Sequence, residues 1–410
     1  ITGREQHVFD SYGAPDAERV IVAIGSICQT AVEAAEYLAK KGEKVGVLSV
    51  HLYRPFSVRH FFQAIPKTVK KIAVLDRTKE PGAIGEPLYL DVKAAYSDAE
   101  VQPVIVGGRF GLGGKDTTPD HMLAVYEELK KDAPKHGFTL AIEDDMTNTS
   151  LAEYPEDVDL TPEGTTACKF WGLGSDGTVG ANKNTVEIIN DHTPKFAQAY
   201  FEYDAKKSFG VTKSHLRFGS DPIRASYYVK WADFVAVHNQ TYLDKYDIAG
   251  EVKPGGKLLL NCTWTPEEVE ANLPAFVKRE IARKGLHLYT IDAVRIAGEL
   301  GLGNHFNMVL QSAFFHLVPI IPVEEAVGYM KAAATKTYFA KGEEVVNRNL
   351  AAIDAGAEGL TEISWPESWK DAEDEPLQAR DVPEVVTRLL DPINAQKGDD
   401  LPVSAFRGYE

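Results

Sequence analysis

Residues 170–184 read FWGLGSDGTVGANKN and combine an apolar strand end, a glycine-rich turn and the start of a helix. Gly172, Gly174 and Gly177 stand at G-x-G-x-x-G spacing, and Gly180 adds a fourth glycine. Glycines at this spacing permit a tight turn, close approach of the backbone to a pyrophosphate, and packing of helix on strand. The helix start adds free N–H groups and a positive dipole end. The stretch therefore predicts an α/β domain that binds a phosphate-bearing ligand.

The side chains of this turn differ in what they can offer a phosphate. Ser175 and Thr178 add hydroxyl donors. The carboxylate of Asp176 would repel a phosphate, so it is expected to point elsewhere and to cap the helix. A pyrophosphate loop fits NAD, NADP, FAD or coenzyme A equally well.

The residues at the end of the next strand, YFEYDAKKS, help to distinguish these ligands. An NAD site places an acid about 20 residues on for the ribose hydroxyl. Asp204 lies 30 residues after Gly174, and Lys206 and Lys207 follow it directly. Two lysines suit an additional phosphate, the 3′-phosphate of coenzyme A or the 2′-phosphate of NADP. They also suit a solvated turn.

Strand and helix patterns alternate on both sides of the loop. Apolar runs at 19–26, 44–50, 70–76 and 103–108 are typical of buried parallel strands, with helical spacing after residue 27 and over 122–131. After residue 163 a second alternating series begins, and it includes an expected helix near residues 222–230. The fold class predicted is α/β, with two three-layer α/β/α domains that have largely parallel sheets, followed by an extended C-terminal connector. The expected limits are 1–150, 151–360 and 361–410.

The bulk composition narrows the possible partners. The chain has 410 residues, and its net charge of −16 argues against nucleic acid or an anionic membrane as a partner. No run of eighteen apolar residues occurs, so no membrane span is expected. The chain begins without Met and ends in VSAFRGYE, which we interpret as a piece of a longer polypeptide.

The three cysteines, Cys28, Cys168 and Cys262, are far apart in the sequence. They indicate a reducing cytoplasm and provide no C-x-x-C pair for zinc or an iron–sulfur cluster. No metal site is therefore expected.

A second glycine run, VGGRFGLGGKDTTP, resembles a P-loop but lacks its pattern. Arg109 stands where a glycine is required, and Asp116 stands where a hydroxyl is required. The run is better explained as a turn into a helix with Thr117 or Thr118 as N-cap and Pro119 first.

Several phrases resemble the pyruvate:ferredoxin (flavodoxin) oxidoreductases. GLGSDGTVGANK and KSFGVTKSHLRFG, at residues 207–219, are similar to that family, with Phe209 departing from its usual SGGVT. The N-terminal ITGREQHVFDSYGAPDAERVIVAIGS resembles a domain equivalent to the C-terminal part of transketolases. SWPESWKDAED and GDDLPVSAF resemble the connector to a ferredoxin-like module.

The resemblance implies a function for the chain. Members oxidise pyruvate with thiamine diphosphate and Mg²⁺, pass electrons through [4Fe-4S] clusters to ferredoxin or flavodoxin, and transfer the acetyl group to coenzyme A. This chain resembles the coenzyme A-binding domain and its neighbour, without the thiamine domains and cluster cysteines. A cytoplasmic homodimer with the remaining domains as partners, and inactivity of the fragment alone, are expected.

The resemblance also implies the binding residues. Gly174, Ser175, Asp176, Gly177 and Thr178 match the loop on the ligand, and Lys206 matches a contact to its nucleotide end. Asn307 and Asn349 match amides near the ligand, although Asn307 could instead cap a helix and Asn349 could be an exposed helix residue. Further candidate cations are Lys183, Lys207 and Arg348.

No catalytic residue is expected, since no nucleophile–base pair can be identified. Coenzyme A binding is therefore weighed against two alternatives, an NAD(P)-binding oxidoreductase and a ligand-free scaffold.

Overall fold

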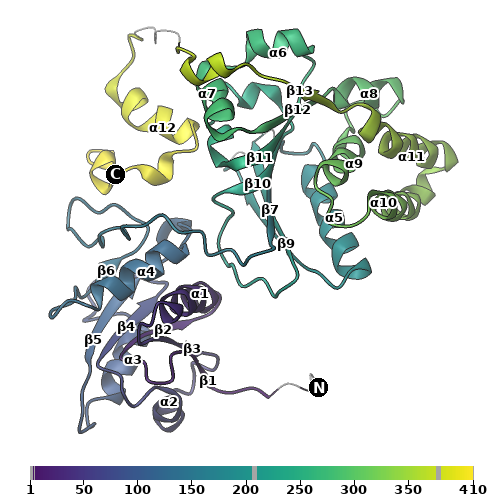
Figure 1. The fold of residues 1–410 in the computed structure, drawn as a ribbon. Coiled ribbons are helices and arrows are strands. Elements are labelled where there is room, and N and C mark those ends of the chain that lie inside the picture. The colour runs from purple at the N-terminus through teal and green to yellow at the C-terminus, as the bar shows by residue number, and fades with distance from the viewer. Residues whose placement is uncertain (1–2, 4, 206–209, 375–379, 410) are drawn as a thin grey trace. The chain divides into compact units, whose positions relative to one another are not determined.

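The computed structural model describes residues 3, 5–205, 210–374 and 380–409. The chain forms two compact units, of which the first comprises residues 1–161, 224–228 and 381–410, and the second residues 162–223 and 229–380. Each unit has helices on both faces of a largely parallel sheet (Figure 1), which confirms the predicted fold class. The domain limits at residues 150 and 360 stay a prediction.

The described strands of the first unit form a sheet in the order β1-β3-β2-β4-β5-β6. The first strand is antiparallel to its neighbour, and the others are parallel. Their bounds are β1 Phe9–Gly13, β2 Arg19–Ile24, β3 Val45–Val50, β4 Lys71–Asp76, β5 Val104–Arg109 and β6 Phe138–Thr139.

Two pairs of helices sandwich this sheet, because its central strands are apolar on both faces. Helices α1 (Ile27–Lys40) and α4 (Pro119–Glu128) cover one face, and α2 (Val58–Ala64) and α3 (Pro87–Ala95) cover the other. Thr118 is the N-cap of α4, as predicted for the second glycine run.

The predicted helix near residues 222–230 is wrong. This stretch is irregular, and residues 224–228 belong to the first unit instead. The Ser226 hydroxyl lies 2.7 Å from that of Thr30 on α1, and the backbone N–H of Tyr228 donates to Asp116 at 2.9 Å. In this stretch, polar groups are satisfied by hydrogen bonds to distant residues instead of by the hydrogen bonds of a helix. Such contacts depend on the tertiary fold and cannot be predicted from the local sequence pattern.

The described strands of the second unit form a sheet in the order β13-β12-β11-β10-β7-β9-β8. Strands β7, β10, β11 and β12 are parallel, while β9 runs antiparallel to both β7 and β8. Their bounds are β7 Thr166–Leu173, β8 Phe196–Tyr203, β9 Val211–Gly219, β10 Ala232–Val237, β11 Val252–Asn261, β12 His287–Ile291 and β13 Thr361–Ile363.

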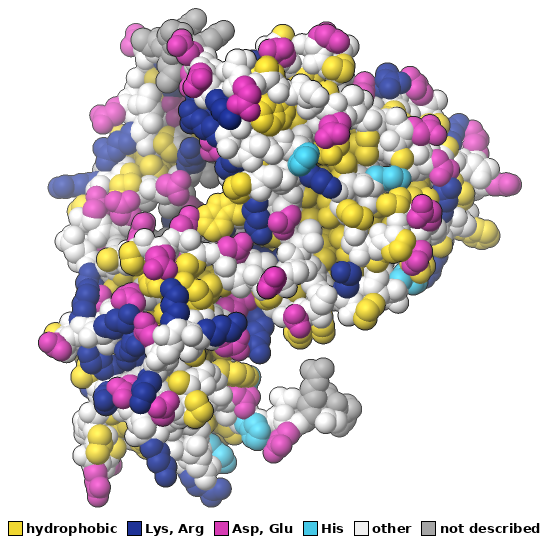
Figure 2. All heavy atoms as spheres, in the orientation of Figure 1, with side chains coloured by type: hydrophobic (Ala, Val, Ile, Leu, Met, Phe, Trp, Pro, Cys, Tyr) yellow, Lys and Arg dark blue, Asp and Glu magenta, His cyan; other side chains and the backbone are white. Residues whose placement is uncertain are grey.

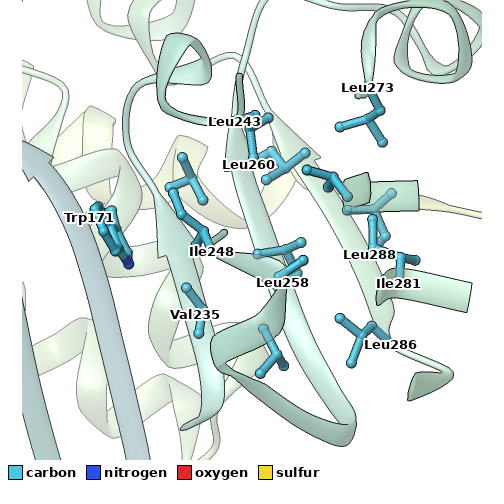
Figure 3. Packing of buried hydrophobic residues seen from close by; sticks show 14 of the residues in the cluster. Trp171, Val235, Leu243, Ile248, Leu258, Leu260, Leu273, Ile281, Leu286 and Leu288 are labelled. Atoms are coloured by element: carbon cyan, nitrogen blue, oxygen red, sulfur yellow. The ribbon is translucent and has the colours of Figure 1, made fainter. Parts of the chain in front are cut away.

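The helices of the second unit divide unequally between the faces of the sheet. On one face pack α5 (Thr178–His192), α8 (Ala293–Glu299), α9 (Asn307–Leu317), α10 (Val323–Tyr338) and α11 (Glu343–Glu358). On the other pack α6 (Pro266–Asn272) and α7 (Ala275–Lys284). Figure 3 shows the core on the face covered by α6 and α7, in which Leu258 and Leu260 of β11 lie between Trp171 of β7 and Ile281 of α7.

The C-terminal tail contributes to both units in turn. The indole N–H of Trp365 donates to the carbonyl of Leu286 in the second unit, and Ser404 donates its backbone N–H to Asp145 in the first. The tail, predicted as an extended connector, contains short helical turns at Glu367–Asp371, Val386–Leu390, α12 (Asp391–Asn394), Gly398–Asp400 and Val403–Phe406.

The surface carries charge of both signs. Figure 2 shows Lys and Arg side chains interspersed with Asp and Glu over the visible face, so the net charge of −16 does not make that face uniformly acidic. Among the described residues, no helix is both long and apolar enough to cross a membrane.

We predict that Leu258→Ala lowers the free energy of unfolding of the second unit by about 2–5 kcal/mol, because it leaves a cavity where a fully buried side chain packs. Urea denaturation measures the change. Ile84→Ala is the control, because that side chain is 88% exposed and should matter by less than about 0.5 kcal/mol. Equal losses for the two variants would contradict this account of the core.

Candidate functional site

The glycine loop, residues 174–177, joins the carboxyl end of β7 to the start of α5. Helix α5 packs on the face of the sheet that carries Phe170, whereas the chain leaving the neighbouring strand β10 packs on the face that carries Trp171. The two connections therefore diverge between β7 and β10. Open α/β sheets bind ligands at such switch points, outside the carboxyl ends of the strands. The strand order thus places the loop where a ligand site is expected.

The loop backbone has an uncommon conformation. Ser175 has φ +77° and Gly177 has φ +89°. A non-glycine residue in this region costs on the order of 1–3 kcal/mol, so the surrounding structure must hold Ser175 there. Gly174 donates its N–H to the carbonyl of Gly210 at 2.8 Å. A Cβ on Gly177 would lie 3.1 Å from Cγ of Asn307, so glycine is required for close approach as well as for its φ.

The side chain of Asp176 bonds to the backbone on both sides of the loop. One carboxylate oxygen accepts the N–H of Leu173 and the other accepts the N–H of Thr178, both at 2.8 Å. Gly177 is the N-cap residue of α5, and Asp176 precedes it, but the Asp176 carboxylate does bond the N–H of the first helical residue, Thr178. The arrangement uses one of the free N–H groups of α5 and places a negative charge at the positive end of the helix dipole.

The remaining amides of the helix start can still donate. The first N–H groups of any helix lack partners within the helix. Within the described residues, the amides of Ser175, Gly177, Val179 and Gly180 have no acceptor. A Cβ on Gly180 would meet no atom of the described residues within 4 Å, so none of them fills the space beside this turn. Such a set of N–H groups can hold phosphate oxygens.

A buried histidine ties the loop to the neighbouring strand. Nδ1 of His238, the residue after β10, lies 2.6 Å from Oγ1 of Thr178, and its backbone N–H donates to the carbonyl of Trp171. Burial lowers the pKa of His238. Asn261 of β11 donates to the His238 carbonyl, and Gly172 makes room because a Cβ there would lie 2.7 Å from Thr178 Oγ1. One bonded set therefore joins β7, α5, β10 and β11.

His238 was not among the predicted residues, although a polar side chain ending the apolar run ADFVAV signals a strand end. A ligand contact by Thr178 remains a prediction, because its hydroxyl is buried and directed at His238 in this structure.

The two predicted asparagines have different surroundings. Asn307 is the first residue of α9, with Phe306 as N-cap, and its side chain lies against Gly177. Asn349 is buried on α11 and donates to the carbonyl of Val345, so the alternative of an exposed residue is wrong. The structure brings Asn307 to the loop and gives no contact between Asn349 and the loop.

The predicted cations have partners outside the loop or lie outside the described residues. The Nζ of Lys183 lies 5.5 Å from the ring centre of Phe201 on β8, and Arg348 donates to the carbonyl of Gly301. Lys206 and Lys207 lie outside the described residues, and their predicted contacts to the nucleotide end stay predictions.

The opposite face of β7 carries a network of charged side chains that was not predicted from the sequence. Lys169 and the indole N–H of Trp171 both contact Glu251, at 2.5 and 2.8 Å. On β9, Lys213 pairs with Glu202 at 2.8 Å and lies 4.7 Å from the ring centre of Trp171. The alternation of polar residues in VTKSHLRFG, every second position from Lys213, was the available signal.

His215 is the titratable centre of this network. Its Nδ1 accepts the backbone N–H of Val229 at 3.2 Å, and its Nε2 lies 3.4 Å from Glu202. Burial lowers the pKa of His215 to about 4, against the opposing hydrogen bond of Glu202. Burial alone would raise the pKa of Glu202, but His215 and Lys213 bring it to about 2. The histidine is therefore neutral at neutral pH.

We predict that His215→Gln flattens the pH dependence of stability between pH 6.5 and 5. The pKa of this histidine is near 6.5 in the unfolded chain and near 4 in the folded one. Unfolding therefore takes up a proton in this window, and the free energy of unfolding decreases as the pH is lowered from 6.5 to 5. The wild-type chain should lose about 2 kcal/mol more than the variant over this range. Urea titrations at stepped pH measure it, and parallel curves would rule out the assignment.

Among the described residues, no group of three or more His, Cys, Asp or Glu side chains could hold a metal ion.

Three family models match this chain. The pyruvate ferredoxin/flavodoxin oxidoreductase model matches residues 167–359, and the model of pyruvate:ferredoxin oxidoreductase core domain II matches residues 17–122. A domain of unknown function matches residues 371–409.

Curated relatives match along the whole chain. The pyruvate-flavodoxin oxidoreductase of Enterobacter agglomerans is 53% identical over 410 residues, covering 100% of this chain and 35% of the relative. The pyruvate:ferredoxin oxidoreductase of Moorella thermoacetica is 53% identical over 407 residues, covering 99% and 35%. The chain thus spans about a third of the length of these relatives.

Among solved structures, the pyruvate oxidoreductase subunit PORC of Thermotoga maritima aligns with 48% of this chain and 98% of its own, at 20% identity and a TM-score of 0.39. The two oxidoreductase models and the sequence identity along the whole chain show that it belongs to the pyruvate:ferredoxin (flavodoxin) oxidoreductase family.

Proposed function

We propose that the second unit binds coenzyme A and positions it for the reaction of a larger pyruvate:ferredoxin (flavodoxin) oxidoreductase. The observation that carries the proposal is the set of unpaired amides at the start of α5, located at the switch point of the sheet. Membership of this family favours coenzyme A over a nicotinamide dinucleotide.

The diphosphate contact would depend on backbone groups rather than cations. Asp176 is the charged side chain of the loop, and its oxygens are already bonded to Leu173 and Thr178. A diphosphate beside it must be held by the amides of Ser175, Gly177, Val179 and Gly180 and by the helix dipole. We propose that Lys206, with Lys207, supplies the positive charge for the 3′-phosphate, and that Asn307 and Asn349 support the site.

The contribution of this chain is positioning rather than bond-making. Anchoring the nucleotide end leaves the pantetheine arm to deliver its thiol to a reaction centre elsewhere in the enzyme. Intramolecular delivery can lower a barrier by about 7–11 kcal/mol when orientation is good. We therefore expect the chain alone to bind coenzyme A weakly and to catalyse no turnover.

In the whole enzyme, pyruvate, coenzyme A and oxidised ferredoxin or flavodoxin would give acetyl-coenzyme A, carbon dioxide and the reduced carrier. Thiamine diphosphate with Mg²⁺ and [4Fe-4S] clusters would supply the redox chemistry. The described residues do not fit these groups, because Cys28, Cys168 and Cys262 are each buried and no cluster of metal ligands occurs among the described residues. Parts of the relatives beyond this chain would have to hold them.

We predict that calorimetric titration of the chain shows binding in the order coenzyme A, then 3′-dephospho-coenzyme A, with NADH and NADPH weaker. Lys206→Ala should reduce the preference for the 3′-phosphate by about tenfold, since it removes a charge-assisted contact. Lys336→Ala, an exposed lysine on α10, is the matched control. Preference for NADPH would favour a nicotinamide-binding oxidoreductase, and no heat with any ligand would favour a scaffold.

We predict that Gly180→Ala has opposite effects on stability and on binding. Alanine inside a helix is favoured over glycine by up to about 1 kcal/mol, and its methyl group would meet no atom of the described residues within 4 Å. The same methyl group would occupy the space beside the free amides and weaken coenzyme A binding. Thermal unfolding and calorimetry measure the two effects, and unchanged affinity would place the ligand elsewhere.

A further inference from the structure

Two residues with carboxamide side chains, Asn239 and Gln240, follow His238 after the end of β10. Strand β10 is the neighbour of β7, the strand that leads into the glycine loop. The Asn239 side-chain oxygen accepts the backbone N–H of Thr241 at 3.1 Å and the hydroxyl of the same residue at 2.9 Å. The Gln240 side-chain oxygen accepts the backbone N–H of Thr263, beyond the end of β11, at 3.1 Å. Both oxygens are thus committed to the chain, which fixes the orientation of each amide.

The nitrogens of these amides are left as donors. Within the part of the chain that the structure describes, neither the Asn239 nor the Gln240 side-chain nitrogen has an acceptor. Both residues are half-buried rather than fully exposed. Each amide nitrogen carries two N–H groups, so this edge presents uncharged hydrogen-bond donors beside the switch point.

Uncharged donors suit an uncharged ligand group. A phosphate is bound more strongly by cations and helix N-termini, which give charge-assisted bonds. The pantetheine arm of coenzyme A is neutral, and its two amide carbonyls are acceptors. Buried Tyr242 and half-buried Trp264 belong to the apolar side of the same edge, as suits the carbon atoms of an arm.

We infer that the pantetheine arm of bound coenzyme A leaves the glycine loop across the ends of β10 and β11, with Gln240 donating to a carbonyl of the arm. The inference rests on the proposed function. Neighbouring strands lie about 4.8 Å apart, so the two carboxamides are within about one to two strand spacings of the loop. On the other side of β7 lies β9, which is antiparallel and begins at this edge of the sheet. The carboxyl ends of neighbouring parallel strands are therefore found on the β10 side of the loop, and we place the arm there.

The test compares coenzyme A with adenosine 3′-phosphate 5′-diphosphate, which lacks the arm, by calorimetry on the whole chain. Gln240→Met removes the donors without adding charge. Gln240→Glu removes them but keeps an oxygen for the N–H of Thr263. In both variants the ratio of the two affinities should shift against coenzyme A by about fivefold to tenfold, the worth of one hydrogen bond. The ratio cancels any general repulsion introduced by the glutamate.

Gln102→Met is the matched control, because this exposed glutamine precedes β5 in the first unit. Thermal unfolding checks that each variant is folded. An unchanged ratio, or equal loss of both ligands, overturns the inference while leaving the proposed function intact. If the unaltered chain binds neither ligand, the proposed function itself fails.

Discussion

The two hydrogen bonds accepted by the Asp176 carboxylate hold the glycine loop together. One comes from Leu173, the last residue of β7, and the other from Thr178, the first residue of α5. They join strand end to helix start across a turn in which Ser175 has a positive φ that serine does not readily adopt. With Thr178 also held by His238 of the next strand, the amides at the helix start are fixed before any ligand arrives. Such preorganisation reduces the entropy lost on binding.

Strand β7 is apolar on one face and carries charged side chains on the other, and the contacts on both faces hold the strand that leads into the loop. Phe170 packs into the apolar cluster under α5 and α9. On the other face, Lys169 and Trp171 share Glu251, and the pairs of Lys213 and His215 with Glu202 continue the network onto β9 and β8. Buried charges of this kind persist only when they are paired and hydrogen-bonded. The network therefore restricts how β7 and β9 can align.

The elements that were predicted from sequence are those with strong local signals. The runs that became β2 and β4 are apolar on both faces, and helix α4 begins at Pro119 with Thr118 as its N-cap. Strand β9 was missed because its buried polar residues interrupt the apolar pattern, and the helix near 222–230 was wrong because that stretch bonds to the first unit. In the site, the inward role of Asp176 was foreseen from charge repulsion. The position of His238 was not, because it depends on which strand lies beside β7.

By itself, the sequence determined a glycine-rich loop between strand and helix, because glycine spacing and apolar runs act over a few residues. It also carried the resemblance that the comparisons confirmed as family membership. Only the tertiary structure decided that β10 is the neighbour of β7, and so that Thr178 faces His238 and that Asn239 and Gln240 follow the strand next to β7. Strand order is set by packing between distant segments, and no local pattern contains it.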